Sequence, residues 1–152
     1  MPRDSHFVAL ENMYLAAPIN EFYDPRIQVS EAAATVEIEL AERFFHSAAT
    51  VHGSVYFKML DDAAFFAANS LEREFFVLTT SFTTYLTRPV SAGKLRSVGR
   101  VVNRNKSQFI AEAVVHDADG NEDRARERDL RAQPVPLEER ARLFGLGSSS
   151  PW

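Results

Sequence analysis

The sequence predicts an α+β fold in which an antiparallel sheet wraps around one long central helix. After Gly53, residues 54–71 contain no proline or glycine, and their apolar side chains surround most of the helical circumference, which is typical of a buried helix. Strand-like segments lie on both sides of that helix, one before it and four after it. We expect a single domain over residues 1–152, with a short N-terminal helical extension and a C-terminal tail.

Before the long helix, the pattern predicts one helix and one strand. Residues Ser5–Ala17 are expected to form a short amphipathic helix with Ser5 as its N-cap, and Pro18 should end it. A turn-rich stretch, Asn20–Pro25, follows. Residues Ala32–Leu40 then alternate between apolar and polar side chains, which predicts a half-buried strand with these residues facing inward: Ala34, Val36, Ile38 and Leu40.

After the long helix, the sequence predicts a meander of strands. On the first of them we expect one face to pack on the helix, formed by Phe76, Leu78, Thr80, Phe82, Thr84 and Leu86. The turn Asp117–Gly120 should lead into the last strand, and residues 137–143 are expected to form a surface helix. The four predicted strands are Phe75–Thr87, Lys94–Asn103, Ser107–Asp117 and Glu122–Ala132.

Composition limits the classes of protein that the chain can represent. The 152 residues are 45% apolar and 25% charged, as in ordinary globular domains. The absence of cysteine excludes disulfides, thiol nucleophiles and thiolate metal sites, and it suits a reducing compartment such as the cytoplasm. The longest apolar run near the middle of the chain is Ala63–Ala68, so the sequence predicts neither a signal peptide nor a membrane span.

The distribution of charge argues against nucleic acid as a partner. The net charge is −4, and the arginines of residues 124–131 alternate with acidic side chains that cancel them locally. A nucleic-acid groove requires an uncancelled basic stripe with stacking aromatics.

Three motifs along the chain resemble those of a known family. The segment His46–Ala63 contains His52-Gly53-Ser54, then Phe57, then Asp61-Asp62-Ala63. It resembles the start of the central helix in hotdog-fold thioesterases of the phenylacetate-pathway type, whose pattern is Asn, six residues on His-Gly-Gly, then Phe, then Asp-x-Ala. The other two motifs are Tyr85–Gly93, which looks like their strand ending in Arg-Pro and a glycine turn, and His116–Gly120, which looks like their last hairpin.

The resemblance covers about residues 33–132, with three departures. His46 stands where the family has Asn, and Ser54 replaces the second glycine of His-Gly-Gly. Residues 124–129 are more charged than the family's last strand, and we expect them to form an exposed edge strand protected by that charge. The resemblance implies a hotdog fold and a homodimeric or homotetrameric acyl-CoA thioesterase. It implies no cofactor, because CoA is part of the substrate.

Asp61 is the expected catalytic carboxylate. It lies in the middle of an apolar helix, where an ionised carboxylate is costly unless it is paired or lies in a cleft. Thioester hydrolysis needs an activated water or a carboxylate nucleophile, and Asp61 occupies the position of the family's carboxylate. The alternative is a structural carboxylate paired to a core arginine or capping a strand. Asp62 lies about 100° further round the helix, so the two cannot share one role.

Gly53 begins the long helix, where backbone N–H groups lack partners and the helix dipole is positive. Such donors stabilise a thioester oxygen that gains negative charge, and glycine lets the substrate approach closely. The simpler alternative is a glycine that only eases the turn into the helix. Gly53 and Asp61 are about 12 Å apart along the axis, so one thioester cannot contact both. The site is therefore expected to combine Gly53 of one subunit with Asp61 of another, as the resemblance also implies.

Two histidines precede the helix. The spacing of His46 and His52 is unlike the His-x-x-x-His of a metal-binding helix, and without cysteine we expect no metal site. The resemblance implies a positioning role for His52; its alternative is a loop histidine that hydrogen-bonds the backbone. His46 could contact the thioester or the attacking water as Asn does, with an added pH dependence.

Thr79 is the nearest match to the Ser or Thr that assists the carboxylate in this family, with Thr80 one position away. Selection of β-branched residues for strand propensity is the alternative. Other functions also stay open. They are a non-catalytic hotdog protein that binds acyl-CoA or an aromatic ligand, a hotdog hydratase or dehydratase whose histidine motif is missing here, and a cone-shaped α+β cyclase or isomerase.

Overall fold

The computed structural model describes residues 2–117. Two N-terminal helices are followed by two strands, a 3₁₀ turn, a long helix and two further strands. In chain order these are α1 (Ser5–Ala16), α2 (Asn20–Tyr23), β1 (Arg26–Ser30), β2 (Ala33–Glu39), the 3₁₀ turn Glu42–Phe44, α3 (Gly53–Asn69), β3 (Lys94–Arg104) and β4 (Phe109–Asp117).

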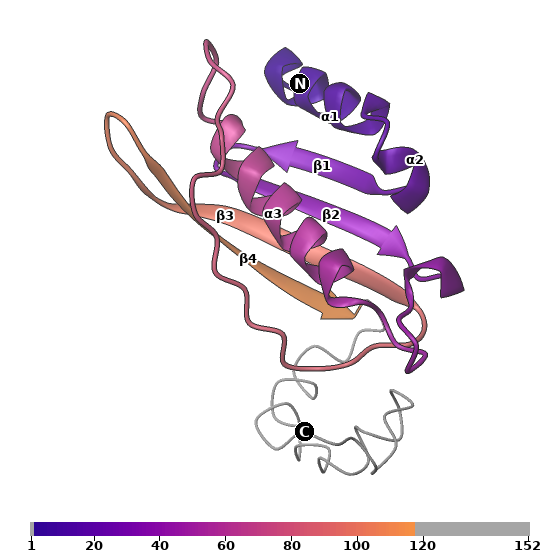
Figure 1. Cartoon of the computed structure of the whole chain (residues 1–152). Coiled ribbons are helices and arrows are strands. Elements are labelled where there is room, and N and C mark those ends of the chain that lie inside the picture. Colours follow the sequence, from indigo (N-terminus) through magenta and orange to yellow (C-terminus); the bar gives the residue numbers. More distant parts are fainter. Residues whose placement is uncertain (1, 118–152) are drawn as a thin grey trace.

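The four strands form one antiparallel sheet in the order β1-β2-β3-β4. Helix α3 lies across one face of this sheet, while α1 and α2 lie at the β1 side (Figure 1). The predicted α+β arrangement of an antiparallel sheet packed on one long helix is confirmed. The segment that follows α3 runs back beside it before the chain enters β3 (Figure 1).

The alternating pattern of β2 places its apolar side chains in the core. Ala34, Val36 and Ile38 are buried, as predicted, and the strand ends within one residue of its predicted bounds. The predictions of β3 and β4 are also confirmed, within two residues at each end. β1 was not predicted, because in five residues it offers only Ile27 and Val29 as inward apolar positions.

Helix α3 packs very closely on β3 at Gly99. A Cβ atom at this glycine would lie 2.2 Å from the carbonyl oxygen of Ala63, which is far inside contact distance. Only a residue without a side chain allows the strand and helix backbones to approach this far. The contact fixes the middle of α3 on the sheet, two residues from Asp61.

Helix α3 is not buried all round. The face toward the sheet and α1 is buried, but Phe57 is 44% exposed and Leu60 and Phe65 are only partly covered. The apolar pattern correctly predicted the helix, but a single chain does not cover its whole circumference. The uncovered face is the one that carries Asp61.

The predicted strand Phe75–Thr87 is wrong for this structure. The segment is extended but forms no ladder with β4 or any other described strand. A strand requires a partner for its backbone groups, which alternation alone does not supply. The predicted face is correct in part, because Phe76, Phe82 and Leu86 lie against α3. It is wrong at Leu78, which is exposed, whereas Thr79 of the opposite predicted face points at α3.

The N-cap of α1 also differs from the prediction. Asp4, not Ser5, caps the helix, because its carboxylate accepts the N–H of His6 at 2.9 Å. The helix itself ends at Ala16, before Pro18, as expected. The predicted turn Asp117–Gly120, the strand 122–132, the helix 137–143 and the tail lie, from residue 118 on, outside the described residues. Among residues 2–117, no helix is long and apolar enough to cross a membrane.

Candidate active site

Asp61 lies half-buried on the uncovered face of α3. Its Oδ1 accepts a hydrogen bond of 3.2 Å from the hydroxyl of Thr79, which lies on the extended segment after the helix. Within residues 2–117 the other oxygen, Oδ2, has no hydrogen-bond partner. The structure therefore brings Asp61 and Thr79 together, and it leaves one carboxylate oxygen available to a substrate or a water.

The surroundings of Asp61 raise the pKa of its carboxyl group above the ordinary value. Burial is the largest cause, and the charge of Asp62 acts in the same direction. The hydrogen bond from Thr79 and the charge of Lys58 lower the pKa and partly offset this rise. A carboxylate with a raised pKa is a stronger base than an exposed one, which suits proton transfer near neutral pH.

Asp62, the neighbour of Asp61, is engaged in structural contacts through one of its carboxylate oxygens. Its Oδ2 lies 2.6 Å from Nζ of Lys58, one helical turn earlier, and accepts a 2.7 Å hydrogen bond from the hydroxyl of Tyr14 on α1. Burial and the charge of Asp62 raise the pKa of Tyr14, which keeps the phenol protonated. The two adjacent aspartates thus have different environments, one open and one paired.

Two cavities meet at Asp61. The larger, of about 390 Å³, lies between α3, the segment 75–82 and the β3–β4 hairpin. The smaller, of about 250 Å³, lies between α3 and the N-terminal helices. Asp61, Phe65 and Phe76 line both cavities, and the two phenylalanine rings lie 5.2 Å apart. These three residues form the wall that the cavities share.

The N-terminus of α3 holds a second group of the predicted residues. Nδ1 of His52 accepts the N–H of Ser54 at 3.1 Å and lies 2.8 Å from its hydroxyl, so His52 is the N-cap of the helix. This backbone contact fits both the positioning role and the alternative of a loop histidine that hydrogen-bonds the backbone. Within residues 2–117 the N–H of Gly53 has no hydrogen-bond partner, so it remains available as a donor at the positive end of the helix.

His46 lies in the turn that leads to α3, and its ring is engaged within that turn. Nδ1 accepts the N–H of Ala48 at 3.0 Å, which identifies Nε2 as the protonated nitrogen that faces Thr50 Oγ1 at 2.7 Å. The ring centroid lies 6.4 Å from that of His52. His46 thus belongs to the group at the start of α3, beside His52 and Gly53.

The predicted site residues therefore form two groups on one chain. One group is Asp61, at the middle of α3, with Thr79 beside it. The other is Gly53 at the N-terminus of α3, with His52 and His46 before it, about 12 Å from Asp61 along the helix axis. Sequence reasoning missed Lys58, although its spacing of four residues from Asp62 is the usual one for a helical ion pair. It also missed the phenylalanines shared by the two cavities, which no local pattern distinguishes from core residues.

An antiparallel sheet packed on one long helix is the arrangement of the hotdog fold. A sequence model of the thioesterase superfamily matches residues 48–123, half of the chain. The chain belongs to the thioesterase superfamily. No protein of curated function matches the sequence.

Solved structures of this fold resemble the chain over most of its length. A thioesterase family protein from Silicibacter pomeroyi is 20% identical, with a TM-score of 0.66 over 72% of this chain and 82% of that one. The PaaI protein of the phenylacetic acid degradation operon of E. coli is 18% identical, with a TM-score of 0.66 over 75% and 86%. A conserved protein from Pseudomonas aeruginosa is 23% identical, with a TM-score of 0.60 over 70% and 87%. At these identities the likeness is one of fold.

Proposed function

We propose that this chain is an acyl-CoA thioesterase that hydrolyses a thioester to a free acid and CoA. Asp61 is its catalytic carboxylate, and each site is shared between two subunits of a homodimer. No resident cofactor or metal is needed, because CoA is part of the substrate. The observation that carries the proposal is the contrast between Asp61, open to two cavities, and Asp62, paired with Lys58 and Tyr14.

The chemistry requires a base or nucleophile on one side of the thioester and a donor to its carbonyl oxygen on the other. Asp61 either takes a proton from the attacking water or attacks the carbonyl carbon itself. In both routes the C–S bond breaks and the sulfur leaves as a thiolate that gains a proton. In the second route water then cleaves the anhydride formed between the acyl group and Asp61, so that in both routes water supplies the new oxygen of the acid. The N–H of Gly53, at the positive end of α3, would stabilise the oxyanion.

Exposed apolar side chains support the dimer. Large apolar residues that a monomer would leave in water lie on α3, on the segment after it and on β4. They are Phe57, Phe75, Phe76, Leu78, Tyr85, Leu86, Ile110 and Val114. Light scattering would show whether this surface forms a homodimer or a homotetramer. A chain without cysteine suits a reducing environment, so we propose the cytoplasm as its location.

The test is hydrolysis of a panel of acyl-CoA thioesters, followed with a thiol-trapping dye, by the wild type and two adjacent variants. Asp61→Asn keeps the volume of the side chain and removes its charge, so turnover should fall at least about 10²-fold. Asp62→Asn is the matched control and should keep turnover, because Asp62 serves structure. The assignment fails if Asp61→Asn turns over like the wild type and Asp62→Asn does not.

A non-catalytic acyl-CoA-binding protein is the second candidate. The observation that favours it is that both ring nitrogens of His46 are engaged within its own turn, in place of the family's Asn. Calorimetry that detects acyl-CoA binding, together with no thiol release from any thioester of the panel, would establish this function in place of hydrolysis.

A further inference from the structure

The smaller cavity beside Asp61 is built by the N-terminal helices. Met13 of α1 and Ile19, just before α2, lie on one side of it, and Phe65, Phe66 and Phe76 lie on the other. Its walls are therefore mostly apolar and aromatic. At about 250 Å³ it is smaller than the roughly 300–1,000 Å³ of pockets that take drug-sized ligands. It has room for part of a substrate and not for a whole acyl-CoA.

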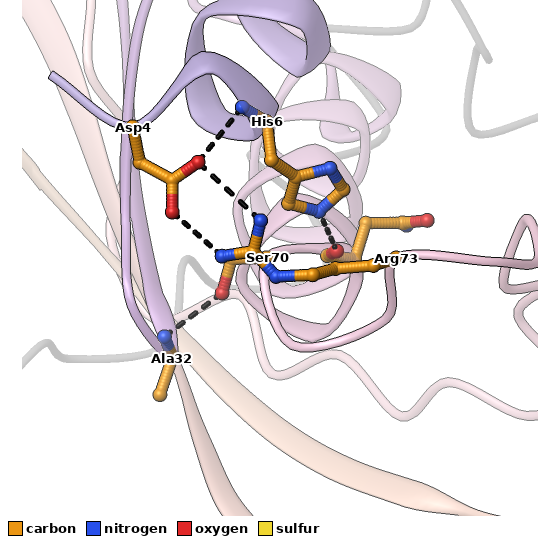
Figure 2. Close-up of polar contacts among 6 residues, drawn as sticks. Asp4, His6, Ala32, Ser70 and Arg73 are labelled. Carbon is orange, nitrogen blue, oxygen red and sulfur yellow. Dashed lines mark hydrogen bonds and ion pairs between the residues drawn. The ribbon is translucent and has the colours of Figure 1, made fainter.

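The wall formed by α1 is fixed at its start and in its middle. At its start, Asp4 pairs with Arg73 at 2.6 Å, and Nε2 of His6 lies 2.9 Å from the carbonyl oxygen of Asn69, so that α1 is tied to the end of α3 (Figure 2). In its middle, Glu11 accepts the N–H of Val29 on β1 at 2.7 Å. The cavity is therefore formed before a ligand arrives, which lowers the entropic cost of binding.

Ser70 strengthens the same anchor. Its hydroxyl accepts the N–H of Ala32 at 2.8 Å, between β1 and β2 (Figure 2). The same hydroxyl donates to the carbonyl of Ala67 at 2.7 Å. The end of α3 is thus joined both to the sheet and, through Arg73, to α1. In the cavity wall itself, the hydroxyl of Tyr14 on α1 donates to Asp62 at 2.7 Å, which holds α1 against the middle of α3.

The charges that border the cavity leave one carboxylate without a counter-ion. Lys58 and Asp62 form an ion pair in which both side chains are largely buried, and Tyr14 donates a further hydrogen bond to the same carboxylate. Asp61 lines the same cavity without an ion pair, so the lining carries one net negative charge when Asp61 is ionised. That charge repels a negative acyl terminus, and the apolar walls disfavour any charged group, whereas an uncharged apolar group meets neither cost.

We propose that this cavity receives the acyl group of the thioester, and that α1 restricts it to compact apolar acyl groups without a charged end. This inference rests on the proposed thioesterase function. A carbonyl that reacts at Asp61 is next to the opening of this cavity. Phe65 and Phe76 separate this cavity from the larger one. The N-terminal helices thereby determine substrate specificity, whereas α3 supplies the chemistry.

The test compares two tryptophan substitutions on the same helix. Met13→Trp fills the cavity, whereas Leu15→Trp, at a position 51% exposed and lining neither cavity, is the matched control. With benzoyl-CoA or hexanoyl-CoA, Met13→Trp should lower kcat/KM at least about 10-fold, because small volume changes in a pocket have effects of this size. With acetyl-CoA, both variants should resemble the wild type.

Ile19→Trp narrows the cavity from its other side and gives the same test if Met13→Trp does not fold. Met13→Ala should shift the preferred acyl chain toward longer homologues. Calorimetric binding of the same acyl-CoAs to Asp61→Asn, with and without Met13→Trp, measures the cavity without turnover.

The outcomes separate the two proposals. If wild-type protein hydrolyses the panel but Met13→Trp, Ile19→Trp and Leu15→Trp change the acyl profile equally, the cavity inference is overturned and the thioesterase stands. If no thioester is hydrolysed but Met13→Trp weakens binding of hexanoyl-CoA and not of acetyl-CoA, the cavity inference stands and the proposed hydrolysis fails.

Discussion

Refolding two inactive variants together tests whether each active site is built from two subunits. One chain carries Asp61→Ala and the other Gly53→Val. Each homodimer should be inactive, because one lacks the carboxylate and the other has a branched side chain at the N-terminus of α3. At Gly53 even a Cβ atom would lie 3.0 Å from Cδ1 of Leu86, a movable side-chain end, so the fold should tolerate the substitution.

The magnitude follows from the helix. α3 is continuous from Gly53 to Asn69, so residues 53 and 61 are about 12 Å apart along its axis. A carbonyl held about 3 Å from a donor and attacked from about 3 Å bridges only roughly 7 Å. One chain therefore cannot supply both groups to one thioester. In an isologous heterodimer one site carries both defects and the other is intact. If about half of the dimers are heterodimers, half of their sites are active, so the sample should recover about a quarter of wild-type activity.

The matched control is a chain that carries both substitutions, refolded with an equal amount of wild type. With shared sites every heterodimer is inactive, so about a quarter of the activity remains. With sites inside one chain, each wild-type chain stays active and about half remains. Thiol release gives the activity, and native mass spectrometry gives the fraction of heterodimers. A complementing mixture that stays inactive although heterodimers form would refute the shared site.

Two other predictions follow from the contacts. Gly99→Ala must displace the backbone of Ala63 by about 1 Å, so it should lower the free energy of unfolding by at least about 1–3 kcal/mol, measured by urea denaturation. Thr79→Val removes a hydrogen bond that lowers the pKa of Asp61, so the acidic limb of the kcat/KM profile should move to higher pH.

Each of these has a control and a contradicting result. Gly53→Ala is the control for Gly99→Ala: it adds a Cβ atom against the flexible end of Leu86 and should unfold near the wild-type urea midpoint. Equal urea midpoints for the two variants would refute the close packing of β3 on α3 at Gly99. Thr79→Ser keeps the hydroxyl, so its kcat/KM profile should keep the acidic limb of the wild type. If Thr79→Val also leaves the acidic limb where it is, the hydrogen bond from Thr79 does not act on Asp61.

The elements that sequence patterns predicted well are those whose partners lie inside the described chain. β2 has three alternating side chains that all pack into the core, and α3 has a long apolar sequence without a breaker. In both elements the local pattern and the tertiary contacts require the same structure, so the pattern alone is sufficient to predict the element. The two groups of site residues on α3 could likewise be placed, because helix geometry alone fixes their separation.

The failures occur where structure depends on partners that a local pattern does not contain. Residues 75–87 alternate like a strand, but no described strand pairs with them, and Thr79 points at the helix. The cap of α1 was misplaced by one residue because Asp4 and Ser5 are both good capping types. Asp4 also contacts Arg73, a residue 69 positions away, and no pattern near the helix end shows this contact.

The choice between Asp61 and Asp62 shows how a tertiary contact turns two similar side chains into different groups. They are adjacent on one helix, and the sequence separated them only through a family resemblance. In the structure, Tyr14 of α1 reaches Asp62 and, together with Lys58, satisfies it, whereas Asp61 faces away from this pair toward Thr79. The same helix α1 contributes Met13 to the cavity beside Asp61. The N-terminal helix therefore acts twice on the proposed site. Its Tyr14 donates a hydrogen bond to the carboxylate that would compete with Asp61, and its Met13 shapes the space into which a substrate at Asp61 would extend.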